Sequence, residues 1–421
     1  MPELAVAAEV WIWKHFVGAV AETGDGQITF EYDPAFARSG LEISPLKLPL
    51  SKQGPVTFPE LQRLEAFAGL PGVLADALPD RFGNAVIRKY FTDRGRPDDA
   101  MRPVQKLLYV GKRAMGALEF RPPIRVERSA ERESLEIAAL MEQARIVIEG
   151  RPDAAIPEIM RVGASAGGAR PKALVLWNRT TNKIRSGFAK PQAGDEYWIM
   201  KFDGVGELEA PDPTPKPFNR IEYAYSRLAR DAGIDMPDTA LLEERRCGHL
   251  MVKRFDRIGN TRLHLHSLGG LHHVDYNNPG QFSYEQFLRT ILQLDLGYPA
   301  LEEGFRRGVF NVVGVNQDDH VKNISFLMDQ QGVWRLAPAY DLTYARGAGF
   351  TRVHQMTLNN RVDGFTRKDL LTIGASMGIK RDGADIIDSV VAAMGNWEKY
   401  ARAAKVPADQ IALIKSQHRL V

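Results

Sequence analysis

The stretch that decides the fold is Asn316-Gln317-Asp318-Asp319-His320-Val321-Lys322-Asn323. Within it, Asp318 and Asn323 stand five positions apart in one short polar segment. A second carboxylate, Asp341, comes later, at the end of an apolar run. An acid, an amide and a later acid in this order supply oxygen ligands for a hard divalent cation, together with a carboxylate that can accept a proton.

Phosphoryl transfer needs these groups. A carboxylate orients and deprotonates the accepting hydroxyl, and an amide and a second carboxylate hold Mg²⁺ on the phosphates. Asp318, Asn323 and Asp341 have the order of the protein-kinase pattern, and the first two have its spacing. An Asp and an Asn at this distance are also common in turns and helix caps. The position of Asp341 is what favours phosphoryl transfer over turn chemistry.

Length and composition predict a soluble globular protein of two or three domains. Of the 421 residues, 44% are hydrophobic and 25% charged, so the chain can bury large cores. The 55 basic and 52 acidic residues leave a net charge of only +3, too small to indicate nucleic-acid binding. The single cysteine excludes a disulfide framework and a cysteine-rich zinc site, so we expect a reducing, cytoplasmic setting. Charged residues near the N-terminus fit neither a signal peptide nor a membrane span.

The apolar pattern predicts a β-rich N-terminal domain over residues 1–125. Arg121-Pro122-Pro123 ends it, because a proline pair cannot continue regular structure. Gly24-Asp25-Gly26 provides a turn between the first two strands. We expect strands over residues 10–16 and 28–32, followed by helices over residues 59–69 and 73–92.

Two further parts complete the chain. Residues 126–256 combine strands with two helices, and residues 257–421 are mainly helical apart from a strand pair. Strands first and helices afterwards predict an α+β, two-lobed body with a cleft between the lobes. The patterns predict helices over residues 131–148 and 219–233, and strands over residues 173–177, 197–202, 249–255, 323–328 and 333–336.

The segment from Val162 to Lys172 is the richest in glycine. Its backbone N–H groups can close on phosphate oxygens, and the alternative is a flexible interdomain loop. The segment is not a Walker A loop, because Ala169 stands where that motif requires lysine. Lys172 and Lys201 lie beside apolar strands, from which an ammonium can reach phosphates or simply extend into solvent. Glu222 either pairs with Lys201 or lies on a solvated helix face.

Other polar residues leave alternatives open. His320 can touch a nucleotide sugar or brace its loop, and Lys322 can contact a phosphate or remain a surface charge. The histidines at 264, 266, 272 and 273 have neither cysteine nearby nor a His-Glu-x-x-His pattern, which disfavours zinc. Ser165 lacks the glycine frame of a hydrolase nucleophile.

Taken together, these segments resemble the HipA family, the serine/threonine kinase toxins of bacterial type II toxin–antitoxin systems. Three motifs carry the resemblance: the Asp-x-His-x-Lys-Asn run from Asp318, the pair Tyr340-Asp341, and Ser165-Ala166-Gly167-Gly168-Ala169. The similarity extends over nearly the whole chain. It implies a protein-kinase-like core, residues 126–256 and 257–421, behind a HipA-type N-terminal domain, residues 1–125.

The resemblance also implies roles for individual residues, with ATP and Mg²⁺ as cofactors. Asp318 is then the catalytic base, Asn323 and Asp341 hold the metal, and Ser165 is a site of autophosphorylation that switches the enzyme off by charge repulsion. The nucleotide would contact Gly167, Gly168, Ala169, Arg170, Pro171, Lys172, Lys201, Lys253, Arg254, Phe255, His320, Lys322 and Tyr340. Arg170-Pro171 departs from the Gln-Glu expected in this family, and Pro171 has no backbone donor.

The expected partners follow from the same resemblance. They are a HipB-like helix-turn-helix antitoxin, operator DNA reached mainly through that antitoxin, and a protein substrate such as an aminoacyl-tRNA synthetase. The departure at Arg170-Pro171 supports an alternative, a kinase-fold scaffold that is catalytically weak and acts as a corepressor. A small-molecule kinase would use the same Asp and Asn.

Overall fold

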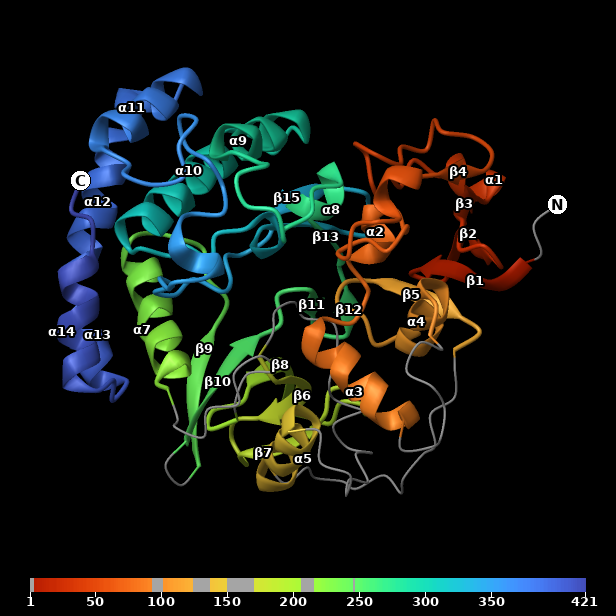
Figure 1. Cartoon of the computed structure of the whole chain (residues 1–421), viewed down its shortest axis with the longest axis horizontal. Helices are drawn as coiled ribbons and strands as arrows, with labels where there is room; N and C mark the ends of the chain where they lie inside the picture. Colours follow the sequence, from red (N-terminus) through yellow and green to blue (C-terminus); the bar gives the residue numbers. More distant parts are fainter. Residues whose placement is uncertain (1–3, 93–100, 124–136, 150–169, 206–215, 245–246) are drawn as a thin grey trace.

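The computed structural model has a mixed α+β fold with a two-lobed, protein-kinase-like core and an additional N-terminal domain (Figure 1). It describes residues 4–92, 101–123, 137–149, 170–205, 216–244 and 247–421. Ser165, Gly167, Gly168 and Ala169, for which the sequence predicts phosphate contacts or phosphorylation, lie outside these ranges. Among the described helices, none is both long and apolar enough to cross a membrane.

The N-terminal domain is built on an antiparallel sheet with the strand order β4-β3-β2-β1-β5. Alternate side chains of its long strands, such as Val10, Ile12 and Phe30, are fully buried, as a sheet covered on one face requires. Its strands are β1 (Leu4–Ile12), β2 (His15–Thr23), β3 (Ile28–Tyr32), β4 (Val56–Thr57) and β5 (Leu118–Arg121). Its helices are α1 (Pro34–Ala37), the short 3₁₀ turn Pro59–Leu61, α2 (Gly72–Ala75), α3 (Arg81–Thr92) and α4 (Pro103–Val110).

Three expectations for this domain were wrong. Residues 10–16 do not form one strand, because Trp13 and Lys14 take positive φ angles of 46° and 74° and turn β1 back into β2. Residues 73–92 do not form one helix either, since the chain leaves α2 before Pro79 and begins α3 at Arg81. The helix expected over residues 59–69 is reduced to its first turn. The turn at residues 24–26 is confirmed.

The first lobe of the core contains a second antiparallel sheet, with the order β7-β6-β8-β10-β9. Helix α7 packs against β9 and β10, and it also contacts the helices of the second lobe (Figure 1). The expected strands at residues 173–177, 197–202 and 249–255 and the helix at 219–233 are confirmed within a few residues, whereas β7 and β9 were missed. The elements are α5 (Ile137–Glu149), β6 (Lys172–Asn178), β7 (Lys183–Ser186), β8 (Asp195–Lys201), α7 (Phe218–Asp231), β9 (Thr239–Glu244) and β10 (Cys247–Lys253).

The second lobe is mainly helical, as expected. Its small sheet has the order β13-β14-β15, and the hairpin β14–β15 lies where the sequence predicted a strand pair. The strands are β11 (Arg257–Ile258), β12 (Thr261–Arg262), β13 (His264–Ser267), β14 (Ser325–Met328) and β15 (Trp334–Leu336). The helices are α8 (Leu268–His272), α9 (Tyr284–Gln293), α10 (Tyr298–Val313), α11 (Arg367–Ser376), α12 (Ala384–Met394), α13 (Trp397–Ala403) and α14 (Ala408–Gln417), with 3₁₀ turns Val321–Asn323, Phe350–Arg352 and Lys380–Gly383.

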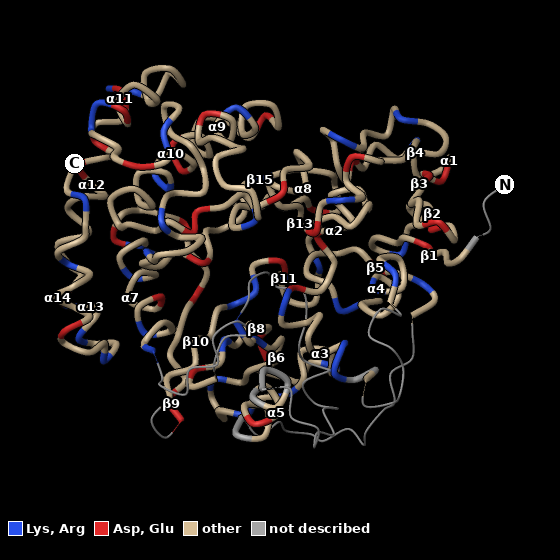
Figure 2. Tube along the Cα trace, viewed as in Figure 1, with Lys and Arg blue, Asp and Glu red and all other residues tan. Residues whose placement is uncertain are grey.

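Two apolar cores hold the chain together. One joins the N-terminal domain to the sheet of the first lobe, since Phe120 of β5, Trp198 of β8 and Met251 of β10 belong to one buried cluster. The other joins α7 to the helices of the second lobe, where Tyr225 and Phe310 are buried together. Lysine and arginine residues are interspersed with acidic residues along the described trace, in agreement with the small net charge (Figure 2). The N-terminal domain is therefore packed into the rest of the protein.

Candidate functional site

Lys201, at the end of β8, is the cation of a buried charge cluster. Its ammonium donates to Glu222 Oε1 of α7 at 2.6 Å and also forms an ion pair with Asp341. Burial alone would lower the pKa of Lys201, but the two carboxylates raise it above its ordinary value. Burial raises the pKa of Glu222. The charge of Lys201 opposes this rise, and the charge of Asp341 adds to it. The strand, the helix and the loop at Asp341 thus meet at one ammonium group.

The Asp318 loop, residues 316–323, brings the other candidate residues to the same place. Asn323 Nδ2 donates to the backbone oxygen of Asp318 at 2.9 Å, which closes the loop and leaves the amide oxygen for another ligand. The Asp318 side chain is 41% exposed, and His320 Nε2 lies 3.8 Å from its Oδ1. Asp318 therefore keeps an accessible carboxylate while its backbone is fixed.

The charges around Asp318 and Asp341 shift the pKa values of these two carboxylates in opposite directions. Burial raises the pKa of Asp318, the His320 and Arg170 charges oppose this, and the charges of Asp341 and Asp319 add to it. Burial would also raise the pKa of Asp341, but Lys201 and Lys172 lower it below its ordinary value. The site thus contains one carboxylate that stays ionised and another that takes up a proton more readily, which suits metal binding and base catalysis respectively.

Local backbone geometry explains how the loop keeps its shape. Asp341 has a φ of 54° and Val315 a φ of 55°, left-handed values that are uncommon for Asp and rare for a β-branched residue. Asp319 is 3% exposed and accepts hydrogen bonds from Tyr284 Oη (2.6 Å), His354 Nδ1 (2.8 Å) and the Gln355 backbone N–H (2.7 Å). These contacts fix the buried Asp319 within the loop, and the left-handed values of Val315, just before the loop, and of Asp341 are local strain of a kind that is frequent at functional sites.

The side chain of His320, within the Asp318 loop, lies near two aromatic rings. Its ring centroid is 5.1 Å from that of Tyr276 and 6.3 Å from that of Phe350. Its Nδ1 is buried and has no hydrogen-bond partner among the described residues. A buried ring nitrogen without a partner is unusual, and a bound polar group would satisfy it.

Lys322 and Tyr340 hold the loop to its surroundings. The Lys322 ammonium donates to Asp76 Oδ1 of the N-terminal domain at 2.6 Å, so this lysine pairs with a carboxylate of another domain. Its contact with a phosphate stays a prediction. Tyr340 Oη donates to the backbone oxygen of Lys322 at 2.7 Å and lies 2.6 Å from Ser325 Oγ. Phe255 stacks on the Tyr340 ring with a centroid distance of 5.4 Å.

The described end of the glycine-rich segment also reaches this region. Arg170 lies over the Phe218 ring, 3.9 Å from its centroid, at the first turn of α7. Pro171 O accepts from the Phe202 N–H at 3.1 Å, which continues the pairing of β6 with β8 beyond Lys172 and Lys201. Lys172 is buried and its ammonium lies 3.3 Å from Asp80 Oδ2, a second carboxylate of the N-terminal domain. Arg170 and Lys172 both act on the candidate carboxylates through their charge.

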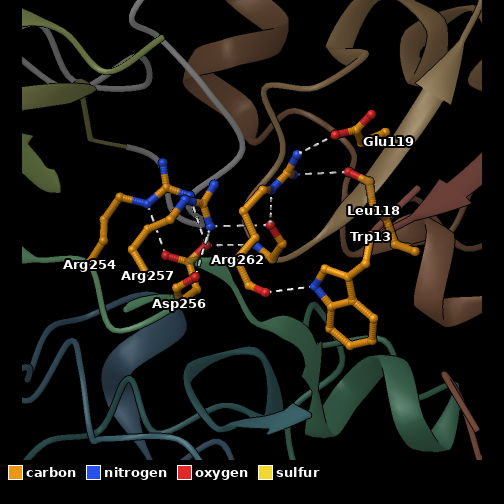
Figure 3. Close-up of polar contacts among 8 residues, drawn as sticks. Trp13, Leu118, Glu119, Arg254, Asp256, Arg257 and Arg262 are labelled. Atoms are coloured by element: carbon orange, nitrogen blue, oxygen red, sulfur yellow. Dashed lines mark hydrogen bonds and ion pairs between the residues drawn. The ribbon is translucent and has the colours of Figure 1, made fainter. Parts of the chain in front are cut away.

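The segment expected to be the hinge is fixed to the N-terminal domain. The Arg254 side chain is buried and forms a bidentate pair with Asp256, with distances of 2.9 and 2.7 Å (Figure 3). Asp256 Oδ2 also accepts from the Gly116 N–H at 2.7 Å. The Lys253 ammonium pairs with Glu196 near the surface. The side chains of Lys253 and Arg254 are thus engaged with carboxylates, whereas Phe255 stacks on the Tyr340 ring.

The four histidines of β13, of α8 and of the position after α8 form hydrogen bonds within the protein. Their partners are Ile43 O for His264, Ser44 and Asp76 for His266, Thr290 for His272, and the Gly72 N–H for His273. Burial lowers the pKa of His264 to about 3 and that of His272 to about 4. Among the described residues, no group of His, Cys, Asp and Glu has the arrangement of a metal site.

Comparison with known proteins identifies the family. The HipA-like C-terminal domain matches residues 164–397, and the HipA N-terminal domain matches residues 8–121. The chain belongs to the HipA family. A solved structure, HipA of Shewanella oneidensis in a toxin–antitoxin complex with HipB and operator DNA, has the same fold, with a TM-score of 0.67 and 17% identity over 97% of this chain and 95% of that one.

Two curated relatives are similar in sequence. The Sinorhizobium fredii protein named "Putative kinase Y4dM" is 24% identical over 358 residues, which cover 81% of this chain and 78% of the relative. The Haemophilus influenzae protein named "Putative kinase" is 28% identical over 159 residues. That second match covers 33% of this chain and spans about half of the relative, 46%.

Sequence reasoning missed the residues that support the site from a distance. Asp76 and Asp80 contact Lys322 and Lys172 from the N-terminal domain, and nothing in the local pattern around either acid indicates this. Asp319 is next to Asp318 in the motif, but it is buried and accepts hydrogen bonds that hold the loop, whereas the carboxylate of Asp318 is accessible. The spacing within the motif indicates which residues meet, whereas the partners from other domains appear only in the fold.

Proposed function

We propose that the chain is an ATP- and Mg²⁺-dependent serine/threonine protein kinase that acts as the toxin of a type II toxin–antitoxin pair. The observation that carries the proposal is the meeting of Lys201, Glu222 and Asp341 beside the Asp318 loop. Protein kinases need a strand lysine paired with a helix glutamate, and an acid close to both for the metal. Membership of the HipA family and the names of the two relatives support the same reaction.

In the proposed mechanism, Asp318 accepts the proton of the substrate hydroxyl as the hydroxyl oxygen forms a bond to the γ-phosphorus of ATP. The bond between that phosphorus and the bridging oxygen breaks, and ADP leaves. The Asn323 amide oxygen and the Asp341 carboxylate would hold Mg²⁺, which neutralises phosphate charge when it is bound. Lys201, oriented by Glu222, would bind the phosphates.

The remaining nucleotide contacts are assigned by the family resemblance. Gly167, Gly168, Ala169, Arg170, Pro171 and Lys172 would surround the phosphates, and the segment Lys253-Arg254-Phe255 would face the adenine with His320, Lys322 and Tyr340 nearby. Because the Arg254 side chain is buried against Asp256, its contact with the adenine would come from the backbone. Autophosphorylation at Ser165 would place a charge of about −1.5 to −2 in the phosphate-binding segment and stop the reaction.

The proposed partners are a HipB-like antitoxin and, through it, operator DNA. The support is that the Shewanella protein of the same fold was solved as a complex with HipB and its operator. The net charge of +3 agrees with a chain that reaches DNA mainly through another protein. The proposed substrate is a component of translation such as an aminoacyl-tRNA synthetase.

Transfer of labelled phosphate from ATP tests the proposal. Wild-type protein with Mg²⁺ should label itself at Ser165, and Asp318→Ala should lower the rate by about 10²- to 10⁴-fold, because the base is lost. Asp329→Ala is a matched control, since Asp329 caps the β14–β15 turn through the Gln331 and Val333 N–H groups and lies outside the site. Undiminished labelling in Asp318→Ala would refute the assignment of the base.

A catalytically weak corepressor scaffold is the second candidate. It is favoured by Arg170-Pro171, because Pro171 has no N–H for a phosphate and Arg170 lies on the Phe218 ring. Nucleotide affinity separates the two functions. A kinase should gain thermal stability as ATP and Mg²⁺ are raised above the dissociation constant, whereas a scaffold should gain little.

A further inference from the structure

Asp76 reaches the active-site region from another domain. It follows α2 in the N-terminal domain, and α2 packs on α8 of the second lobe (Figure 1). The two helices are so close at Gly72 that no side chain fits there, since a Cβ on Gly72 would lie 2.0 Å from Gly270 O. The Gly72 N–H also donates to His273 Nε2 at 3.0 Å. The position of Asp76 relative to the second lobe is therefore set by backbone contacts.

The Asp76 carboxylate is a buried anion with four donors, and all four come from the kinase core. Oδ1 accepts from Ser267 Oγ and Lys322 Nζ, each at 2.6 Å, and Oδ2 from His266 Nδ1 and the Ser267 N–H, each at 2.7 Å. Burial alone would raise the pKa of Asp76, but Lys322 and His266 lower it far below its ordinary value. The carboxylate is thus ionised, and its hydrogen-bonding capacity is used entirely by the other domain.

Lys322 carries this contact to the proposed metal ligands. It is the central residue of the turn Val321–Asn323, and so it is bonded directly to Asn323. Its backbone oxygen accepts from Tyr340 Oη at 2.7 Å, and Tyr340 is bonded to Asp341. The Asn323 amide in turn holds the backbone of Asp318. One carboxylate therefore fixes the segments that contain the base and both metal ligands.

A second acid of the N-terminal domain makes a similar contact with a lysine of the first lobe. Asp80 Oδ2 lies 3.3 Å from the Lys172 ammonium, and both side chains are only 4% exposed. Lys172 is the last residue of the glycine-rich segment and the first residue of β6. Burial raises the pKa of Asp80, although Lys172 opposes this. The short segment from Asp76 to Asp80 thus engages lysines in both lobes.

We propose that Asp76 is a positioning residue for phosphoryl transfer. It touches neither nucleotide nor substrate, and it acts by holding Lys322 so that Asn323 and Asp341 face one metal ion. The N-terminal domain is then a working part of the kinase, because its carboxylates fix the catalytic loop against the first lobe. The inference rests on the proposed kinase function.

The test compares the steady-state kinetics of Asp76→Asn with those of the wild type. The amide would turn an N–H toward donors and remove the charge that holds Lys322. We expect kcat to fall by about 10²-fold, the effect of a misplacement of about 1 Å, with KM for ATP changed by less than about threefold. The Mg²⁺ concentration for half-maximal rate should rise, because Asn323 and Asp341 are no longer held together.

Two further variants separate positioning from loss of fold. Trp13→Phe removes the hydrogen bond from Trp13 Nε1 to Arg262 O, 2.7 Å, another contact between the N-terminal domain and the core (Figure 3). Its kcat should match that of the wild type. Lys322→Met removes the same ion pair from the other side, and it should not slow Asp76→Asn further, since residues that act as one unit are not additive. If Asp76→Asn does not fold, the expected fall in kcat is measured in Lys322→Met instead.

The outcomes are distinct. Wild-type protein without phosphate transfer would refute the proposed function itself. Active wild-type protein with an unchanged kcat in Asp76→Asn would overturn only this inference. Three other results would also overturn this inference alone. They are an equal fall of kcat in Trp13→Phe, additive effects of Asp76→Asn and Lys322→Met on kcat, and a change in Asp76→Asn that is confined to KM for ATP.

Discussion

Replacement of Lys201 by methionine tests the electrostatics of the site without any assumption about function. The Lys201 side chain is 12% exposed, and its partners Glu222 and Asp341 are 8% and 26% exposed. Removing one member of a buried ion pair leaves uncompensated charge and costs about 3–5 kcal/mol. We therefore expect Lys201→Met to lower the free energy of unfolding by about that amount at neutral pH.

The loss should depend on pH. Burial already raises the folded-state pKa of Glu222 above its ordinary value of 4.5, and without Lys201 this rise becomes larger. A group with a raised folded-state pKa contributes stability that is lost as pH rises. The variant should thus be closest to the wild type in mild acid, where Glu222 is protonated, and furthest from it at neutral pH and above.

Urea unfolding at several pH values is the assay, with Lys253→Met as the control. Lys253 pairs with Glu196, but these side chains are 39% and 33% exposed, and such a surface pair contributes about 0–1 kcal/mol. Equal losses in the two variants, or a loss in Lys201→Met that does not change with pH, would refute the buried cluster.

Three further predictions follow from single residues. The value of kcat/KM for phosphate transfer should fall as pH drops through the pKa of Asp318, which burial raises, and a pH–rate profile without an acid limb would contradict its role as base. Tyr340→Phe should cost about 1–3 kcal/mol in urea unfolding, because it leaves the Lys322 carbonyl without its donor, and a neutral result would exclude that contact. Hydrogen bonds from Arg220 lower the pKa of Glu243 to about 2, so its stabilising effect is present above its ordinary pKa of 4.5 and is lost as pH falls toward 2. Glu243→Gln should therefore lose less thermal stability than the wild type on acidification, and parallel curves would contradict this.

The residues that sequence reasoning located well are those whose chemistry depends on local order. The spacing of Asp318 and Asn323 reflects a loop that a side-chain hydrogen bond closes. The apolar pattern before Asp341 predicts the hairpin that β14 and β15 form. Lys201 and Glu222 were found because each lies at a regular position of a strand or helix. These features are encoded within a few residues of where they act.

The features that escaped prediction depend on contacts between distant segments. The hairpin at Trp13 and Lys14 needs positive φ angles at residues that do not favour them, and cross-strand pairing with β2 determines it. The commitment of Lys322 to Asp76 needs two domains to be packed together. The sequence around Lys322 suggests a phosphate contact or a surface charge, and nothing in it indicates an ion pair with another domain.

Calorimetric titration with ATP, with and without Mg²⁺, tests the central claim most directly, because the claim is that Asn323 and Asp341 hold one metal ion on a nucleotide. Wild-type protein should bind ATP much more tightly with Mg²⁺ present, and Asp341→Asn and Asn323→Ala should each lose that difference. Asp329→Ala, outside the site, should keep it. Binding that does not depend on Mg²⁺, or a Mg²⁺ effect that survives in both Asp341→Asn and Asn323→Ala, would contradict the account.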